Sequence, residues 1–273
     1  MISSGGRACS FREFEALART DFRTEPRFPV FHVPYDGNMF PPKLMDSVCV
    51  PEEVFRSYHA RMRDTAAGRF VPRAYCGGDM LARFDVSRLL CDVERFIGPE
   101  EEMEQFGMGF CYEKAFDGTV IKRVTDERKQ AARRFYDAHH ARLNAVCGRH
   151  PRVLLIDLHS FSSDILLPHV RAQNPALPDV CIGADPVYTP AELVRRIGLR
   201  LDEAGLTHLT NTPYAGSFVP DAVYKGKSSC DLISVMLEFN KRLYLRENGE
   251  PVEEALSNIR SLIETILADC VDL

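Results

Sequence analysis

The chain has 273 residues, enough for one large α/β domain with its own core, and its 45% hydrophobic and 27% charged residues are ordinary for a globular protein. A net charge of −5 argues against a surface for nucleic acid or anionic lipid. No apolar run approaches the roughly 20 residues of a membrane span, and the first residues lack the apolar stretch of a signal peptide. We therefore expect a small-molecule partner, with no nucleic-acid and no membrane partner.

The cysteines indicate a reducing compartment. The nine cysteines are odd in number, scattered, and form no Cys-x-x-Cys pair. This pattern favours free thiols over a disulfide framework or a thiolate zinc site, and predicts a cytoplasmic protein. Because no repeat or flexible linker divides the chain, we expect a single domain over residues 1–273.

Strand-like and helix-like segments alternate along the chain. In chain order, the pattern predicts strands at 28–33 and about 84–93, a helix at about 126–147, strands at 152–158 and 179–183, a helix from Thr189 to Gly205, strands at 206–211 and 231–239, and a helix at about 251–268. Thr189 is the expected N-cap of its helix, with Pro190 in the first turn. His139 and His140 fall on the first helix, where one is expected to face the core and the other the solvent. The alternation predicts a mixed, largely parallel sheet flanked by helices.

The central predicted strand ends in polar residues. An apolar run over residues 153–156 leads directly into Asp157, His159 and Ser160. Because side chains alternate along a strand, Asp157 and His159 share a face, so the carboxylate can orient the imidazole. In open α/β sheets, ligands bind beyond the carboxyl ends of such strands. The alternative is a strand that ends in a turn with a surface histidine.

Two other predicted strands also end in side chains that can bind a metal ion. His32 closes the first strand before a turn at Pro34, and Glu238 closes the strand at 231–239. Two imidazoles and one carboxylate with an open position are the usual ligands of catalytic zinc, and a nearby glutamate can serve as general base. The spacing alone is a weak signal, because no local His-x-x-x-His motif is present.

Taken in order, the motifs resemble those of the N-formylglutamate amidohydrolase family over most of the chain. They are Pro34-Tyr35-Asp36-Gly37, Met62-Arg63-Asp64, Ser87-Arg88 with Asp92-Val-Glu94-Arg95, Gly107-Met-Gly109, Asp157-Leu-His159-Ser160, Asn211-Thr-Pro-Tyr214-Ala-Gly216 and Glu238-Phe-Asn240 with Leu243-Tyr244. The resemblance implies a fold like that of the zinc carboxypeptidases. It also implies hydrolysis of N-formyl-L-glutamate to formate and L-glutamate, usually within histidine catabolism.

The resemblance also implies roles for individual residues. His159 is similar to a metal-ligand histidine, Asp64 to the acidic residue that could supply a second ligand, and Glu238 to the general base. The remaining positions are the carboxylate-binding or carbonyl-polarising Arg88 and Arg95, the substrate wall at Tyr214 and Gly216, and the supporting residues Tyr35, Asp36, Asp157 and Ser160. A different reading of the arginines is that they pair only with Asp85, Asp92 or Glu94.

One departure from the family pattern affects the metal. Tyr35 stands where the family has histidine, and a phenol with a pKa near 10 is a poorer zinc ligand than imidazole at neutral pH. His32 could replace it if the chain bends at Pro34, which would give a ligand set of His32, Asp64 and His159. The alternatives are a weakened zinc site, or a metal-free, non-catalytic relative that keeps the ligand pocket. The sequence does not decide which acyl group and amino acid are recognised.

Overall fold

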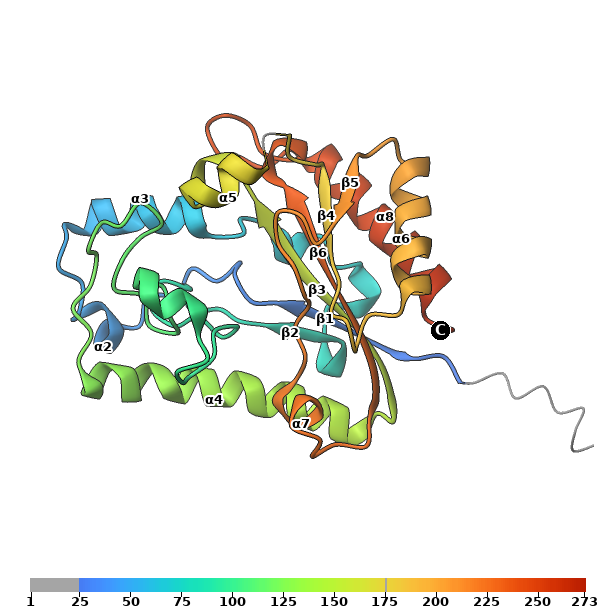
Figure 1. The fold of residues 1–273 in the computed structure, drawn as a ribbon, viewed down its shortest axis with the longest axis horizontal. Coiled ribbons are helices and arrows are strands. Elements are labelled where there is room, and N and C mark those ends of the chain that lie inside the picture. The colour runs from blue at the N-terminus through green and yellow to red at the C-terminus, as the bar shows by residue number, and fades with distance from the viewer. Residues whose placement is uncertain (1–24, 175) are drawn as a thin grey trace, which may run out of the picture.

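A six-stranded sheet forms the centre of the protein, with the strand order β2-β1-β3-β6-β4-β5 (Figure 1). The strands are β1 (Phe28–Val33), β2 (Leu81–Arg83), β3 (Arg152–Phe161), β4 (Val180–Gly183), β5 (His208–Thr210) and β6 (Asp231–Asn240). All neighbouring pairs are parallel except β4 and β6. The computed structural model describes residues 25–174 and 176–273, so the first 24 residues of the predicted domain lie outside the description. Within the described residues, the predicted α/β fold with a mixed, largely parallel sheet is confirmed.

Helices cover both faces of the sheet (Figure 1). One face packs against α6 (Ala191–Glu203) and α8 (Glu253–Cys270), and the other packs against α4 (Asp126–Arg149) and the short α7 (Asp221–Tyr224). The helices α2 (Pro42–Met45), α3 (Glu52–Met62) and α5 (Pro168–Gln173) lie beyond the strand ends. No helix in the described part of the chain combines the length and apolar character needed to cross a bilayer.

The alternation of side chains along β3 connects the two layers to the site. Leu154, Ile156 and Leu158 are buried in the core formed with α6 and α8. Val153 and Leu155 are buried in the core formed with α4 and α7. Since Asp157 and His159 continue the second set, they emerge on the α4 face where the strand ends.

The predicted strand at 84–93 is wrong. The strand beside β1 is β2, three residues long, and residues 84–93 leave the sheet as a loop. Leu89, Leu90 and Val93 of this loop are buried in a separate apolar cluster with residues of α3 and α4. Because a short apolar run is buried equally well in a strand or a loop, its hydrophobicity could not identify which it is.

The predicted cap of α6 is also wrong. The N-cap position is Pro190, and the side chain of Thr189 makes no cap bond. Its hydroxyl donates to the carbonyl oxygen of Ser234 at 2.6 Å and accepts from the N–H of Asp185 at 2.8 Å. A tertiary contact with β6 therefore takes the hydroxyl that the sequence pattern assigned to the helix.

The cysteines that the structure describes are free thiols, five of them buried. Cys9 lies outside the described residues. Cys91 and Cys111 pack in the cluster around α3 and α4, where burial raises the pKa of both thiols and keeps them protonated. These two cysteines therefore serve as core residues.

The prediction that one of His139 and His140 faces solvent is wrong, because both are buried. His139 packs against Phe84 and His32. The Nε2–H of His140 donates to the carbonyl oxygen of Val93 at 2.7 Å. The sheet covers the side of α4 that carries His139, and the loop through Val93 covers the side that carries His140. Burial lowers the pKa of both imidazoles, so both are neutral at pH 7.

A third buried histidine, His59 of α3, gives a prediction about acid stability. Burial, together with Arg63 and Arg56, lowers the pKa of His59 from 6.5 to about 4. Between these values the unfolded chain binds a proton that the folded chain does not, so the free energy of unfolding falls as the pH drops, by about 1.4 kcal/mol per pH unit. In His59→Asn, an amide oxygen can still accept from the Ser87 hydroxyl and cannot titrate. Between pH 6.5 and 4, we expect the free energy of unfolding of the variant to fall by about 3 kcal/mol less than that of wild type, measured by urea unfolding.

The matched control is His208→Asn, on a partly exposed histidine. If His59→Asn kept the pH dependence of wild type, His59 would not be the source of the loss in acid.

Candidate active site

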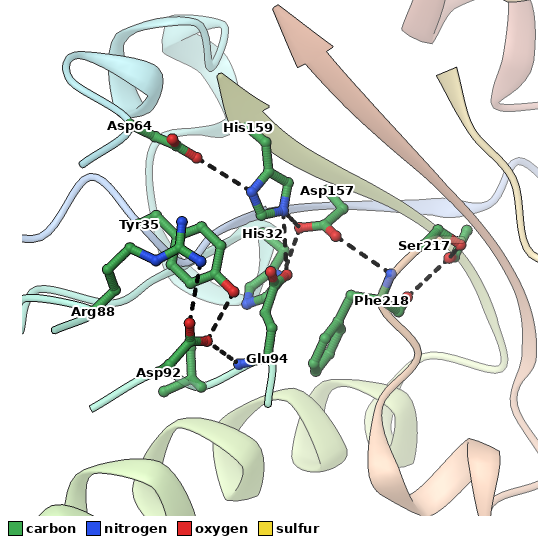
Figure 2. A network of polar contacts seen from close by, with 12 residues as sticks. His32, Tyr35, Asp64, Arg88, Asp92, Glu94, Asp157, His159, Ser217 and Phe218 are labelled. Carbon is green, nitrogen blue, oxygen red and sulfur yellow. Dashed lines mark hydrogen bonds and ion pairs between the residues drawn. The ribbon is translucent and has the colours of Figure 1, made fainter. Parts of the chain in front are cut away.

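A cavity of about 770 Å³ opens at the carboxyl ends of the central strands. Its lining includes Asp157 and His159 of β3 and Glu238 of β6. Loops supply the other predicted site residues that line it, namely Tyr35, Asp64, Arg88, Arg95, Tyr214 and Gly216. The strand ends and these loops together form the candidate active site, part of which is drawn in Figure 2.

The register of the strands places the polar residues side by side. His32 of β1 pairs with Asp157 of β3, and His159 of β3 pairs with Glu238 of β6. Paired residues on neighbouring strands point to the same face, so these four side chains share the α4 face of the sheet. The predicted placement of Asp157 and His159 on one face is therefore confirmed.

His159 lies between two groups of carboxylates (Figure 2). Its Nδ1 is 3.2 Å from Asp64 Oδ2, and its Nε2 is 3.0 Å from Asp157 Oδ1 and 3.2 Å from Glu94 Oε1. Although burial opposes a charge here, the carboxylates of Asp157, Glu94 and Asp64 raise the pKa of His159 well above its ordinary value. Both ring nitrogens are thus occupied in this structure, each facing a different acid.

His32 lies on the other side of Asp157. Its Nδ1 is 2.9 Å from Asp157 Oδ1 and 3.5 Å from Glu94 Oε1. Its Nε2 is 2.8 Å from Nε2 of His139, and the ring of Phe218 packs 4.4 Å away between centroids. One of these two Nε2 atoms donates and the other accepts, so the tautomers of His32 and His139 are linked.

His32, Glu94 and Asp157 each offer a ligand atom within 4.8 Å of the others. The predicted set of His32, Asp64 and His159 needs correction, because the ring of His159 separates its members. Asp64 faces Nδ1, whereas Asp157 and Glu94, the carboxylates shared with His32, face Nε2. The two ring nitrogens of an imidazole point away from one another, so one ion cannot bind on both sides. The sequence reasoning missed Glu94, although it lies in the Asp92-Val-Glu94-Arg95 motif.

The hydroxyl of Tyr35 is directed neither at Asp64 nor at the pair of Asp157 and Glu94. Its hydroxyl donates to Asp92 Oδ1 at 2.8 Å, and the guanidinium of Arg88 lies 3.4 Å from the ring centroid (Figure 2). Burial, Asp92 and Glu94 raise the pKa of Tyr35 well above 10. The side chain is therefore a neutral phenol, and its hydrogen bond is directed at Asp92, a buried partner that the sequence reasoning did not assign to the site.

Both predicted arginines share this one buried carboxylate. Arg88 donates to Asp92 Oδ2 at 3.2 Å, and Arg95 Nε lies 3.7 Å from the same oxygen. The alternative prediction that the arginines pair with Asp92 is therefore confirmed. However, both also line the cavity, and two guanidinium groups against one carboxylate leave a positive charge there.

Glu238 is the most distinctive carboxyl group in the cavity. It is buried, and its Oε2 has no hydrogen-bond partner among the described residues. Burial, reinforced by Asp64 and Glu94 and opposed by His159 and Arg88, raises the pKa of Glu238 to about 8. Such a group can exchange protons near neutral pH.

The remaining predicted residues have different positions. Ser160, Tyr214 and Gly216 line the cavity. Asp36 does not line it and instead accepts from Arg63 at 2.7 Å and from the backbone N–H groups of Ala66 and Gly68 at 3.1 Å. Asp36 thereby holds the turn after α3 that presents Asp64 to His159.

Known proteins resemble this chain in sequence and in fold. The family model described as N-formylglutamate amidohydrolase matches residues 29–245. The fold is similar to that of an N-formylglutamate amidohydrolase from Ralstonia eutropha JMP134, at 21% identity over 90% of this chain and 94% of the other, with a TM-score of 0.67. It is also similar to that of a gene product from Agrobacterium tumefaciens, at 17% identity over 88% of each chain, with a TM-score of 0.60. No curated protein matches the sequence. Since the family model covers most of the chain, this protein belongs to the N-formylglutamate amidohydrolase family.

Proposed function

We propose that the protein hydrolyses the amide bond of a small N-acyl amino acid, with N-formyl-L-glutamate as the substrate that its family indicates. The observation that carries this proposal is Glu238, a buried carboxyl group that opens to the cavity with a pKa of about 8 and an oxygen free to accept a proton. In amide hydrolysis this group takes a proton from the attacking water and delivers it to the nitrogen of the leaving amine.

The arginines supply the complementary charge for an acidic substrate. Arg88 and Arg95 together carry one more positive charge than Asp92 neutralises, and both line the cavity. A guanidinium group binds a carboxylate through two parallel hydrogen bonds. We assign the substrate carboxylate to this pair and the polarisation of the scissile carbonyl to Arg95, with Tyr214 and Gly216 forming the adjacent wall.

The residues at the family's metal position do not fit a metal ion. Asp64 and Nδ1 of His159 remain there, but the histidine that the family has is Tyr35 in this chain. The hydroxyl of Tyr35 is engaged with Asp92, and its raised pKa keeps it from forming a phenolate. Two ligands are fewer than the three that catalytic zinc ordinarily uses.

The group on the other side of the His159 ring does fit. Nδ1 of His32 and Nε2 of His159 each face Asp157 Oδ1 and Glu94 Oε1 at 2.9–3.5 Å. Zinc bonds of about 2.0–2.2 Å at tetrahedral angles separate ligands by about 3.3–3.6 Å, so small shifts would suffice. Imidazole nitrogen and carboxylate oxygen are ordinary ligands of zinc, and a catalytic site keeps one position open for water. We therefore propose that His32, Glu94 and Asp157, whose ligand atoms all lie within 4.8 Å of one another, hold the ion, with Nε2 of His159 beside the two carboxylates.

The residues of this chain would act around that ion. Zinc, when bound, supplies a Lewis acid for the carbonyl oxygen and acidifies a water molecule. With its Nδ1 directed at the ion, His32 carries its proton on Nε2 and donates it to His139. Glu238, paired with His159 across β3 and β6, moves the proton between the water and the leaving nitrogen.

The second candidate function is a metal-free relative that binds a ligand without hydrolysing it. The observation that favours it is Tyr35 in place of the family histidine. The metal measurement below separates the two candidates. A cytoplasmic location, supported by the free cysteines, and a place in histidine catabolism, supported by the family resemblance, are parts of the same proposal.

Replacing the general base should lower turnover strongly without affecting the fold. In Glu238→Gln the side chain keeps its size but cannot accept the proton, so we expect kcat to fall by about 10²–10⁴. The measurement is hydrolysis of N-formyl-L-glutamate, with zinc content and thermal unfolding as checks on integrity. Turnover equal to that of wild type would remove Glu238 from the mechanism.

Metal content tests where the ion is bound. Protein purified without chelator should contain close to one zinc per chain, and His32→Ala or Glu94→Gln should weaken zinc binding by more than about 100-fold, beyond the effect of residues that only orient a ligand. Asp64→Asn should have a smaller effect, because Asp64 faces the other nitrogen of His159. The matched control is Glu102→Gln, an exposed acid that lines the cavity outside this group.

Two outcomes would contradict the proposed ligands or the proposed metal. Loss of zinc in Asp64→Asn with retention in Glu94→Gln would place the ion at the family position and contradict the proposed ligands. Wild-type protein without zinc, and without gain of activity when zinc is added, would support the metal-free relative.

His139 should matter through His32. We expect His139→Leu to lower zinc affinity by about 10–100-fold, because His32 loses the acceptor that keeps its proton on Nε2. His139→Gln, whose amide can replace the ring nitrogen, should retain most of the affinity. Calorimetric titration with zinc measures both, and equal losses in the two variants would indicate that His139 acts only as a core residue.

A further inference from the structure

The cavity is larger than N-formyl-L-glutamate requires. Its volume is about 770 Å³. A ligand of about a dozen non-hydrogen atoms occupies less than about 360 Å³, even at the ~30 Å³ per non-hydrogen atom of liquid water. At least half of the cavity therefore remains when the charged groups have bound such a molecule.

Apolar side chains from separate segments line the cavity beside the charged groups. Phe96 follows the two arginines, Met103 and Phe106 belong to a 3₁₀ helix (Glu102–Phe106), Leu167 precedes α5, and Tyr224 ends α7. Phe96, Phe106 and Tyr224 are 47%, 38% and 58% exposed, and they are among the exposed large apolar side chains of the described residues. Exposed aromatic residues gathered at one opening are typical of a ligand-binding surface.

This wall is built by specific contacts. The N–H of Phe96 donates to one oxygen of Glu101 at 2.7 Å, and the N–H of Met103 donates to the other at 2.8 Å. The hydroxyl of Tyr136 in α4 donates to the carbonyl of Arg95 at 3.0 Å, and the rings of Phe96 and Tyr224 lie 6.3 Å apart. Hydrogen bonds within the loop and one to α4 thus hold the segment that carries Phe96 in place.

The charges of the cavity decide which half of the substrate faces this wall. Among the described lining residues, Arg88 and Arg95 are the only lysines or arginines, whereas Glu102, Asp185 and Asp221 add negative charge. Substrate carboxylates are therefore paired only at the arginines. The apolar wall is left for a neutral part of the molecule, and in an N-acyl acidic amino acid that part is the acyl group.

We propose that the substrate carries a bulky apolar acyl group, aromatic or extended, in place of formyl. This proposal rests on the proposed amide hydrolysis and identifies its substrate class. Water adds to the acyl carbon, the carbon–nitrogen bond breaks, and the products are an apolar carboxylic acid and the free amino acid. No further reactant is needed.

A substrate series tests the proposal. The purified holoenzyme is assayed with N-formyl-, N-acetyl-, N-butanoyl-, N-octanoyl- and N-phenylacetyl-L-glutamate, and with N-formyl-L-phenylalanine. We expect kcat/KM to be at least tenfold higher for the octanoyl or phenylacetyl compound than for the formyl compound, since each added methylene gains contact with the wall. A maximum at formyl-L-glutamate or at formyl-L-phenylalanine would overturn the proposal.

Variants of the wall test its role directly. Phe96→Ala and Tyr224→Ala should lower the ratio of kcat/KM for the phenylacetyl compound to that for the formyl compound by at least fivefold. Leu199→Ala on α6, a residue that is also 47% exposed but lies outside this cavity, is the matched control and should leave the ratio unchanged. An unchanged ratio in both wall variants would show that the aromatic residues do not contact the acyl group.

Binding measurements separate this proposal from the proposed function. Calorimetric titration of Glu238→Gln with N-phenylacetyl-L-glutamate and N-formyl-L-glutamate reports affinity without turnover. Tighter binding of the phenylacetyl compound by a wild-type protein that hydrolyses nothing would retain the substrate class and overturn the hydrolysis. Hydrolysis of the formyl compound with equal or weaker binding of the phenylacetyl compound would retain the hydrolysis and overturn the substrate class.

Discussion

The parallel pairing of β1, β3 and β6 is the constraint on which the site depends. Parallel strands end at the same edge, and their register places His32 beside Asp157 and His159 beside Glu238. Four polar side chains therefore leave the sheet on the face that α4 covers, while the alternate residues Ile156 and Val235 are buried against α6 and α8. A shift of one residue in either pairing would move the acids into the apolar core, so the same burial that stabilises the sheet also determines the geometry of the site.

An excess of negative charge around two imidazoles is the second feature of the site. Asp64, Glu94 and Asp157 all approach His159, and two of these carboxylates also approach His32. Desolvated carboxylates repel one another unless a cation lies between them. The raised pKa of His159 shows that a proton can supply this positive charge, and a bound cation would supply more of it. Tyr35 does not contribute, because its hydroxyl donates to Asp92 and its ring packs against the guanidinium of Arg88.

The site was only partly predictable from the sequence. The side of β3 that carries Asp157 and His159 followed from the alternation of apolar residues, and the candidate ligand His32 followed from its place at the end of β1. Glu94 was considered only as a partner of the arginines, because it follows a segment, 84–93, that was predicted as a strand and is a loop. His139 was read as an ordinary helical residue, since no local pattern reveals that its ring meets His32 from a position more than a hundred residues away in the chain.

By itself, the sequence determined the class of the fold, five of the six strands, the three long helices and the family, because periodic apolar residues and short motifs act locally or in chain order. Only the tertiary structure decided which nitrogen of His159 faces which acid, that the predicted ligands lie on opposite sides of that ring, and that Tyr35 is directed at Asp92. It also decided the size and apolar wall of the cavity. These properties depend on distances between segments far apart in the chain, and side-chain pattern within one segment carries no information about such distances.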